Sequence, residues 1–461
     1  MENRNELKRL AGTVSKLSLP VLVEQFFIVI MGVINTMLAS NMGKEAISAI
    51  GMIDTISNIM IALFGALSIG GTVIVAQYTG QKDSAKASQS AAQALLSNLV
   101  ISAGLAVLLW ILRFLIIRAL YGDADALVLD YADQYFGISL WSYIPIAMIS
   151  VSFGILRGSG DTRTPMRISI IMNLCNVLLS YVLIYGLDIR LGGLDLVLPA
   201  FGVRGAATGL TSARTIGMLL VLIPLLNGSK RIRLTRLELF RPRWDLLRSI
   251  FRLGIPASAE QLMFQGGRLI TQTYIVRLGT AAIAANTISI SVNSLLMVPG
   301  NALAIAATAL VGQQIGAGRF KEARKQLNFL ILAASAAMAL VSLVMLAIKD
   351  PVIRLYTHDE QISQLVSVII LSSLVVQPFI WSTSFITPAG LRGAGDIRYT
   401  MVVSIISMWL LRILLGYVFA VILPWGVLGV WIAMYVDWLC RSIFFVRRVQ
   451  RDAWFAKVVI R

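Results

Sequence analysis

The chain has 461 residues, of which 57% are hydrophobic and only 14% are charged, and its formal net charge is +17. Because soluble domains carry about 25% charged residues, this composition excludes an ordinary soluble protein and indicates one embedded in lipid. A single histidine and two cysteines supply no histidine-based metal site or catalytic triad, and no nucleotide-binding motif occurs. We therefore expect neither an enzyme nor a bound cofactor or metal.

Twelve apolar stretches, each long enough to cross a membrane, follow one another along the chain. In the first half they are expected at 15–40, 48–78, 90–120, 128–156, 164–187 and 198–226. In the second half they are expected at 250–278, 283–314, 324–349, 361–390, 399–423 and 426–448. This pattern predicts an all-α membrane protein with an N-terminal six-helix lobe (1–226), a basic linker (227–249) and a C-terminal six-helix lobe (250–461).

The two halves repeat each other with an offset of about 236 residues, so that Pro20 and Glu24 recur as Pro256 and Glu260. An even number of spans in each repeat gives both halves the same orientation, related by a pseudo-twofold axis along the membrane normal. Inverted repeats would need an odd number of spans in each half and are disfavoured.

Positive charge is concentrated in alternate connections between spans. The densest group lies between the two halves and consists of Lys230, Arg231, Arg233, Arg236, Arg241, Arg243, Arg248 and Arg252. By the positive-inside rule, this linker and both termini are cytoplasmic. A basic stretch can bind nucleic acid, but one placed between spans favours anionic lipid headgroups, so we expect membrane lipids and no nucleic acid as partners.

The seventh span is unusually polar for a segment in hydrocarbon. Glu260 lies four residues after Pro256, which removes a backbone hydrogen bond and can kink the helix. Gln265, Arg268 and Gln272 follow with helical spacing on one face. A polar face of this kind does not face lipid, so it either packs on another helix or lines an aqueous substrate cavity.

Ionisable groups within spans are costly and usually functional, so Glu260 is the first candidate to carry a proton or Na⁺. The structural alternative is an ion pair with Arg268 or with Arg252. Glu24, at the equivalent position of the first half, is a second candidate with weaker support. Asp54 is a third, although an aspartate near a helix start often only caps the helix, and that interpretation is favoured.

Two further charges lie one helical turn apart in the last span. Asp437 and Arg441 can pair on one helix face, and Arg412 of the preceding span can join them. We expect a structural ion-pair network there.

Each half also contains the sequence Leu-Arg-Gly-x-Gly-Asp after its fourth span, at 156–161 and 391–396. The glycines permit a tight turn, the arginines can bind carbonyls at a helix end, and the aspartates can cap the next helix. We expect a structural or gating role for the residues concerned, which are Arg157, Gly158, Asp161, Arg392, Gly393 and Asp396.

The duplicated motif resembles that of the multidrug and toxic compound extrusion (MATE) transporters. The likeness extends over essentially the whole chain and includes the helix-kinking Pro20 and Pro256, Asn173 and Asn176 before Ser180-Tyr181, Gly202-Val203 and Gly426-Val427. It implies a prokaryotic cytoplasmic-membrane protein whose two lobes form a V-shaped cavity without needing an oligomer. It also implies efflux of small organic, often cationic, compounds driven by a proton or Na⁺ gradient.

The chain departs from this family at two acidic positions. Many prokaryotic members have an aspartate at the position of Asn35 and a second aspartate at the position of Ser180, four residues after Asn176. Asparagine and serine oxygens can still bind Na⁺, but they cannot exchange a proton. This shifts the expected coupling to Glu260, which resembles a seventh-span glutamate of other branches, and leaves Asn35, Asn176 and Ser180 as neutral polar groups of the cavity.

The expected function is therefore a cation-coupled exporter of organic compounds that works by alternating access. A first alternative is a flippase or exporter of lipid-linked or anionic metabolites, because Arg268 would repel cations. A second alternative is a membrane receptor or scaffold that transports nothing.

Overall fold

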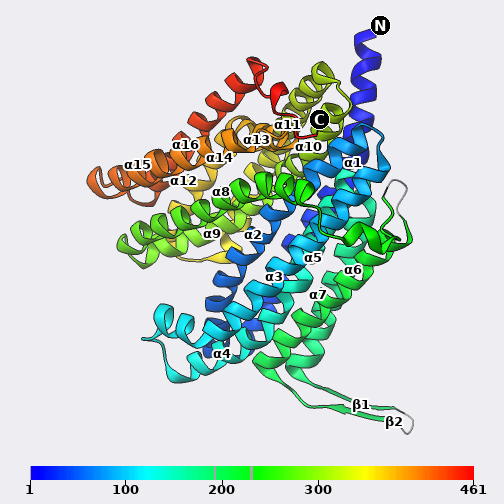
Figure 1. Ribbon diagram of the computed structural model, residues 1–461. Helices are drawn as coiled ribbons and strands as arrows, with labels where there is room; N and C mark the ends of the chain where they lie inside the picture. Colours follow the sequence, from blue (N-terminus) through cyan, green and yellow to red (C-terminus); the bar gives the residue numbers. More distant parts are fainter. Residues whose placement is uncertain (1, 192–193, 229–231, 461) are drawn as a thin grey trace. The chain divides into compact units, whose positions relative to one another are not determined.

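The computed structural model describes residues 2–191, 194–228 and 232–460 (Figure 1). Lys230 and Arg231 of the basic linker lie outside these residues. The chain divides into two compact units. Unit 1 comprises Met1–Gln25, Thr72–Asp83 and Ile255–Arg461, and unit 2 comprises Phe26–Gly71 and Ser84–Gly254. These units differ from the predicted lobes, which follow the sequence repeat at 1–226 and 250–461 with a linker at 227–249. The lobes stay a prediction.

The first half of the chain forms seven α-helices among its described residues. They are α1 (Glu2–Ser40), α2 (Lys44–Gly80), α3 (Ser84–Tyr121), α4 (Ala126–Ser139), α5 (Tyr143–Gly158), α6 (Arg163–Tyr185) and α7 (Gly202–Asn227). A short 3₁₀ turn joins α4 to α5, so these two helices together form the predicted fourth span. The helices of unit 2 pack around an apolar core that includes Ile53, Phe64, Phe136 and Tyr143.

The second half is helical as well. Its helices are α8 (Trp244–Arg277), α9 (Thr280–Leu296), α10 (Val298–Gly316), α11 (Phe320–Tyr356), α12 (Glu360–Val376), α13 (Ser382–Gly393), α14 (Ile397–Ser407), α15 (Leu414–Tyr417) and α16 (Gly426–Gln450). Wider π-helical turns occupy Gln377–Trp381, Met408–Ile413 and Val418–Ile422 and join neighbouring helices into single spans. A π turn changes the direction in which side chains point, and such turns are frequent at functional sites.

The prediction of an all-α membrane protein is confirmed. Ten helical segments of the described chain are long and apolar enough to cross a membrane, and α9 with α10, bent by 53°, would make an eleventh. The remaining predicted span, 250–278, coincides with α8, whose polar residues lower its hydropathy.

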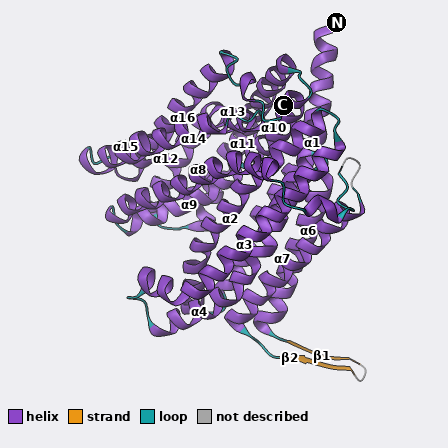
Figure 2. Cartoon of the chain, in the orientation of Figure 1, coloured by secondary structure: helices purple, strands orange, loops and turns teal. Residues whose placement is uncertain are grey.

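A β-hairpin between α6 and α7 was not predicted. Strands β1 (Leu187–Leu191) and β2 (Leu194–Leu198) pair antiparallel, with Leu187 opposite Leu198 and Leu191 opposite Leu194. Figure 2 shows them continuing beyond the ends of α6 and α7. The predicted fifth and sixth spans, which ended at 187 and began at 198, were therefore slightly too long.

Within unit 1, residues that recur in the sequence repeat meet each other. A Cβ atom on Gly80 of α2 would lie 2.0 Å from the carbonyl oxygen of Gln313, and one on Gly316 of α10 would lie 1.9 Å from that of Gln77. Each glycine thus packs on the backbone of the glutamine from the other repeat. This reciprocal contact is what a twofold relation between duplicated segments produces.

The two Leu-Arg-Gly-x-Gly-Asp segments form similar turns with different partners. Gly160 and Gly395 both adopt positive φ, +91° and +96°, which glycine tolerates best. Asp161 Oδ1 accepts hydrogen bonds from the backbone N–H groups of Arg163 and Thr164 at 3.1 Å, so this aspartate supports the start of α6 as predicted.

The predicted cap at the second turn is wrong. Asp396 makes no side-chain capping hydrogen bond to α14. It accepts a hydrogen bond from Arg448 Nε at 2.8 Å instead, because α16 brings that arginine beside it. The arginines of the two turns also differ: the Arg157 guanidinium lies 5.5 Å from the ring of Phe153, whereas Arg392 faces Glu260.

The segment after α16 packs against other parts of unit 1. Trp454 is fully buried, and Val459 donates its backbone N–H to Gln77 Oε1 at 3.2 Å. Gln77 Nε2 in turn donates to the carbonyl oxygen of Gly393 at 3.1 Å. Ile460 is buried as well, so the packed segment extends to the last described residue.

Candidate functional site in unit 2

Unit 2 contains a cavity of about 310 Å³ lined by residues of α1, α2, α4, α6 and α7. This volume is at the lower end of the roughly 300–1,000 Å³ typical of small-molecule sites. The polar side chains that line it are Asn35, Thr36, Asp54, Ser57, Asn58, Tyr135, Asn176, Ser180 and Arg214. Isoleucine, leucine, methionine and alanine side chains form the rest of the wall, so the cavity combines an apolar body with a few polar groups.

Close packing of α7 on α6 forms one wall. A Cβ atom on Gly205 would lie 2.2 Å from the carbonyl oxygen of Leu183, and one on Gly209 would lie 2.6 Å from Ser180 Oγ. Small residues four apart let two membrane helices approach closely. Gly209 thereby lets α7 pack directly against Ser180 at the cavity wall.

Three neutral side chains of the cavity form a hydrogen-bonded chain across two helices. Asn176 Nδ2 of α6 donates to Asn35 Oδ1 of α1 at 3.2 Å, and Ser180 Oγ donates to Asn176 Oδ1 at 3.2 Å. Asn35, Asn176 and Ser180 were expected from the sequence as neutral polar groups of the cavity, and the structure brings all three to this one. Their oxygen atoms are of the kind that bind Na⁺.

Asp54 is the carboxylate of the cavity, and its predicted role as a cap is wrong. Because α2 begins at Lys44, Asp54 lies nearly three turns inside the helix, away from the free N–H groups of its first turn. Tyr135 of α4 donates a weak hydrogen bond to Asp54 Oδ1 at 3.4 Å. The carboxylate therefore points into the space between α2 and its neighbours.

Arg214 of α7 is a cavity residue that the sequence analysis missed. Its Nη1 donates to Ser142 Oγ at 2.7 Å. Within the described part of the chain, no ion pair joins Arg214 to Asp54, although both side chains line the same cavity. The available signal was an arginine in the middle of a predicted span, which the same rule that singled out Glu260 would have found.

Glu260, the first coupling candidate, belongs to unit 1 and does not line this cavity. It is buried with 7% exposure, and Arg392 Nη1 lies 3.5 Å from its Oε1. The expected alternative of a pair with Arg268 or Arg252 is thus replaced by a pair with an arginine of the repeat motif.

The other residues expected beside Glu260 are also in unit 1. Glu24 is buried on α1, and Arg268 of α8 is exposed. Gln272 Oε1 accepts a hydrogen bond from Asn286 Nδ2 at 3.5 Å, and Gln265 is partly buried. Their roles as ion carriers or cavity side chains stay predictions.

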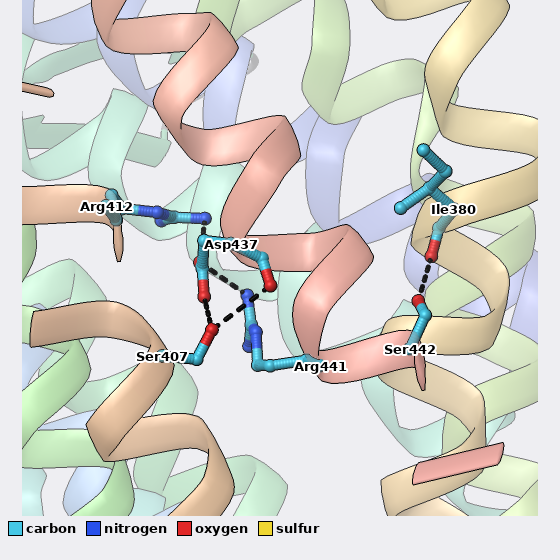
Figure 3. A network of polar contacts seen from close by, with 6 residues as sticks. All are labelled: Ile380, Ser407, Arg412, Asp437, Arg441 and Ser442. Carbon is cyan, nitrogen blue, oxygen red and sulfur yellow. Dashed lines mark hydrogen bonds and ion pairs between the residues drawn. The ribbon is translucent and has the colours of Figure 1, made fainter. Parts of the chain in front are cut away.

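The predicted network around Asp437 is confirmed (Figure 3). Its Oδ2 atom lies 2.9 Å from Arg441 Nη2 and 3.0 Å from Arg412 Nη2, and Ser407 donates a hydrogen bond to Oδ1. Asp437 is fully buried and Arg441 has 2% exposure. The ring of Phe264 lies 5.0 Å from the Arg441 guanidinium and 5.7 Å from that of Arg412, so an aromatic face supports both cations.

A family model named MatE matches residues 20–182 and 256–418, once in each half of the chain. The chain belongs to the MatE family. The resemblance expected from the sequence is confirmed, and this MatE protein is a transporter and not an enzyme, so the receptor or scaffold alternative is set aside.

The similarity extends over nearly the full length of this MatE chain. The Uncharacterized transporter YisQ of Bacillus subtilis is 26% identical over 96% of this chain and 94% of its own. The Probable multidrug resistance protein NorM of Thermotoga maritima is 27% identical over 95% of this chain and 92% of its own. The solved structure of a MOP superfamily transporter from Pyrococcus furiosus, described as having a binding pocket of reversed polarity, has the same fold. It superposes with a TM-score of 0.85 at 22% identity over 97% of this chain and 96% of its own.

Proposed function

We propose that this MatE transporter exports small organic compounds, cations among them, in exchange for H⁺ or Na⁺ by alternating access. The observation that carries the proposal is the cavity of unit 2, in which the Asp54 carboxylate lies among largely apolar walls. The multidrug names of NorM from Thermotoga maritima and MdtK from Pectobacterium atrosepticum support an organic cargo.

Asp54 is the group in this cavity that can bind either a cation or a proton. A carboxylate with apolar surroundings attracts positive charge strongly, because little water competes for it. Neutral Asn35, Asn176 and Ser180 add oxygen atoms that can complete the coordination of Na⁺. Cargo and coupling ion then compete for one carboxylate, and this competition couples their movements in opposite directions.

Glu260 is a second proposed carrier, supported by its burial and by its position in a polar helix. Its neighbour Arg392 already balances its charge, which favours a structural role. Asp54 forms no ion pair among the described residues, although Arg214 lines the same cavity, so we place coupling at Asp54 first and at Glu260 second.

The test uses purified protein in liposomes loaded with a fluorescent organic cation, with a pH gradient or a Na⁺ gradient imposed separately. We expect one gradient to drive cation movement by the wild-type protein and Asp54→Asn to abolish it. Asp130→Asn, an exposed aspartate of α4 that accepts a hydrogen bond from Gln134, is the matched control and should transport normally.

Glu260→Gln, measured beside these variants, separates the two carriers. Normal transport by Asp54→Asn together with loss in Glu260→Gln would move coupling to Glu260. No movement of the cation under either gradient would refute cation export itself.

A second candidate function is export of anionic or lipid-linked compounds. The observation that favours it is Arg214, which places a fixed positive charge in the same cavity. The reversed pocket polarity described for the Pyrococcus furiosus transporter indicates that this fold accommodates such a change. Gradient-driven movement of an anionic dye, but not of the cation, would select this alternative.

For its location, we propose the cytoplasmic membrane of a bacterium with both termini in the cytoplasm. The bacterial relatives and the basic residues at both ends of the chain support this orientation. A single cysteine introduced at Lys44, the first residue of α2, should react with a membrane-impermeant thiol reagent added outside intact cells, whereas one introduced at Lys8 should not. The reverse pattern would invert the topology.

A further inference from the structure

The cavity of unit 2 contains one charged group of each sign, and the two are not paired with each other. Asp54 lies on α2 and Arg214 on α7, and both line the same cavity of about 310 Å³. Among the described residues, neither side chain takes part in an ion pair. Because the two opposite charges share one cavity without forming an ion pair, each of them can bind a separate group of a ligand.

Each charged side chain also keeps free hydrogen-bonding capacity. Asp54 accepts one long hydrogen bond, from Tyr135 to Oδ1, and its Oδ2 atom accepts none from the described residues. Arg214 uses one of its five N–H donors, toward Ser142, within the same part of the chain. The carboxylate and the guanidinium are therefore held in place by one neighbour each and remain available to a ligand.

Together these groups form a template for a molecule with two charged ends. We propose that the cavity of unit 2 binds zwitterionic organic compounds, whose ammonium group pairs with Asp54 and whose carboxylate or other anionic group pairs with Arg214. The apolar body of the ligand lies against the isoleucine and leucine side chains between them. This assignment rests on the proposed function, since it names the class of cargo, but it can be tested without any transport.

The charge balance explains why a zwitterion fits better than a singly charged compound. A plain cation that binds Asp54 leaves the Arg214 charge in the same cavity to repel it, and a plain anion meets the reverse problem at Asp54. A zwitterion satisfies both side chains and leaves no uncompensated charge in the cavity.

The experiment measures binding to the full-length protein in detergent by isothermal titration calorimetry. Three ligands of nearly the same shape are compared: 4-(aminomethyl)benzoate, a zwitterion; 4-(aminomethyl)benzamide, a cation; and 4-(hydroxymethyl)benzoate, an anion. Loss of one charge-assisted hydrogen bond weakens affinity about tenfold or more. We therefore expect the wild-type protein to bind the zwitterion at least about tenfold more tightly than either analogue.

Two variants assign each end of the ligand. Arg214→Gln should remove the preference for the zwitterion over the benzamide, while Asp54→Asn should remove its preference over the hydroxymethyl compound. Arg204→Gln is the control, because Arg204 is an exposed arginine of the same helix that contacts Gln134 and does not line the cavity. It should keep both preferences, and thermal unfolding of every variant verifies that the protein is folded.

The outcomes separate this inference from the proposed function. If the wild-type protein does not bind the zwitterion saturably, binds all three ligands equally, or keeps its preference in Arg214→Gln, the inference is overturned. If the binding preferences hold but neither gradient drives export in liposomes, the coupling mechanism fails and the assignment of the cavity stands.

Discussion

Replacement of Asp437 by asparagine should destabilise unit 1 strongly. At 2.9 and 3.0 Å, each ion pair of Asp437 corresponds to about 5.5 kcal/mol of attraction at an effective dielectric constant near 20. Desolvation of the three buried groups and repulsion between Arg412 and Arg441 offset most of this attraction. Removal of the shared carboxylate leaves two buried guanidinium groups without a counter-charge, which costs about 3–5 kcal/mol.

The contrast with Arg412→Met makes this reasoning specific. That variant leaves Asp437 paired with Arg441 and turns a cluster of two positive charges and one negative charge into a neutral pair. We therefore expect it to cost less than about 2 kcal/mol. Heating in detergent followed by size-exclusion chromatography measures both variants, and Asp437→Asn should lose its folded form at least about 6 °C below wild type. Equal stability of Asp437→Asn and wild type, or a larger loss in Arg412→Met, would refute the argument.

Two further predictions concern packing in unit 2. Gly209→Ala would place a methyl group 2.8 Å from backbone atoms of α6, so it should lower the free energy of unfolding by about 1–3 kcal/mol and weaken ligand binding in the cavity. Gly104→Ala, with open space around it, should be neutral or slightly stabilising. Equal melting temperatures for the two variants would contradict this prediction. Gln93→Leu removes hydrogen bonds to the backbone of residues 239–243, so this segment should become several-fold more sensitive to trypsin. The control variant Gln89→Leu should leave the cleavage rate unchanged. An unchanged cleavage rate in Gln93→Leu would show that other contacts hold the segment.

The sequence predicted the helices well because their cause is local. Span lengths follow from membrane thickness, and the long apolar runs leave little choice of structure. The hairpin was missed because alternation in Leu187–Leu191 is short and lies directly after an apolar span, where a strand and a loop look alike. The cap predicted for Asp54 was wrong because the helix begins four residues earlier than the apolar pattern suggested.

The candidate site was predicted only in part because its contacts are not local. The family resemblance supplied Asn35, Asn176 and Ser180, which the structure brings to one cavity. The pair of Glu260 with Arg392 joins residues more than a hundred positions apart, and no helical spacing rule can find such a pair. Arg214 was visible as a charge within a span, but only the fold shows that it shares its cavity with Asp54.

The docked tail after α16 affects how the protein can be handled. Because Trp454 and Ile460 are buried and Val459 is hydrogen-bonded to Gln77, a purification tag fused directly after Arg461 would begin one residue beyond a packed side chain. A tag that displaces this segment would break the hydrogen bond from Val459 to Gln77, the residue that also contacts Gly393 and Gly316 of the other repeat. An affinity tag placed before α1, or one separated from Arg461 by a long flexible spacer, should leave the contacts of Gln77 with Val459 and Gly393 intact.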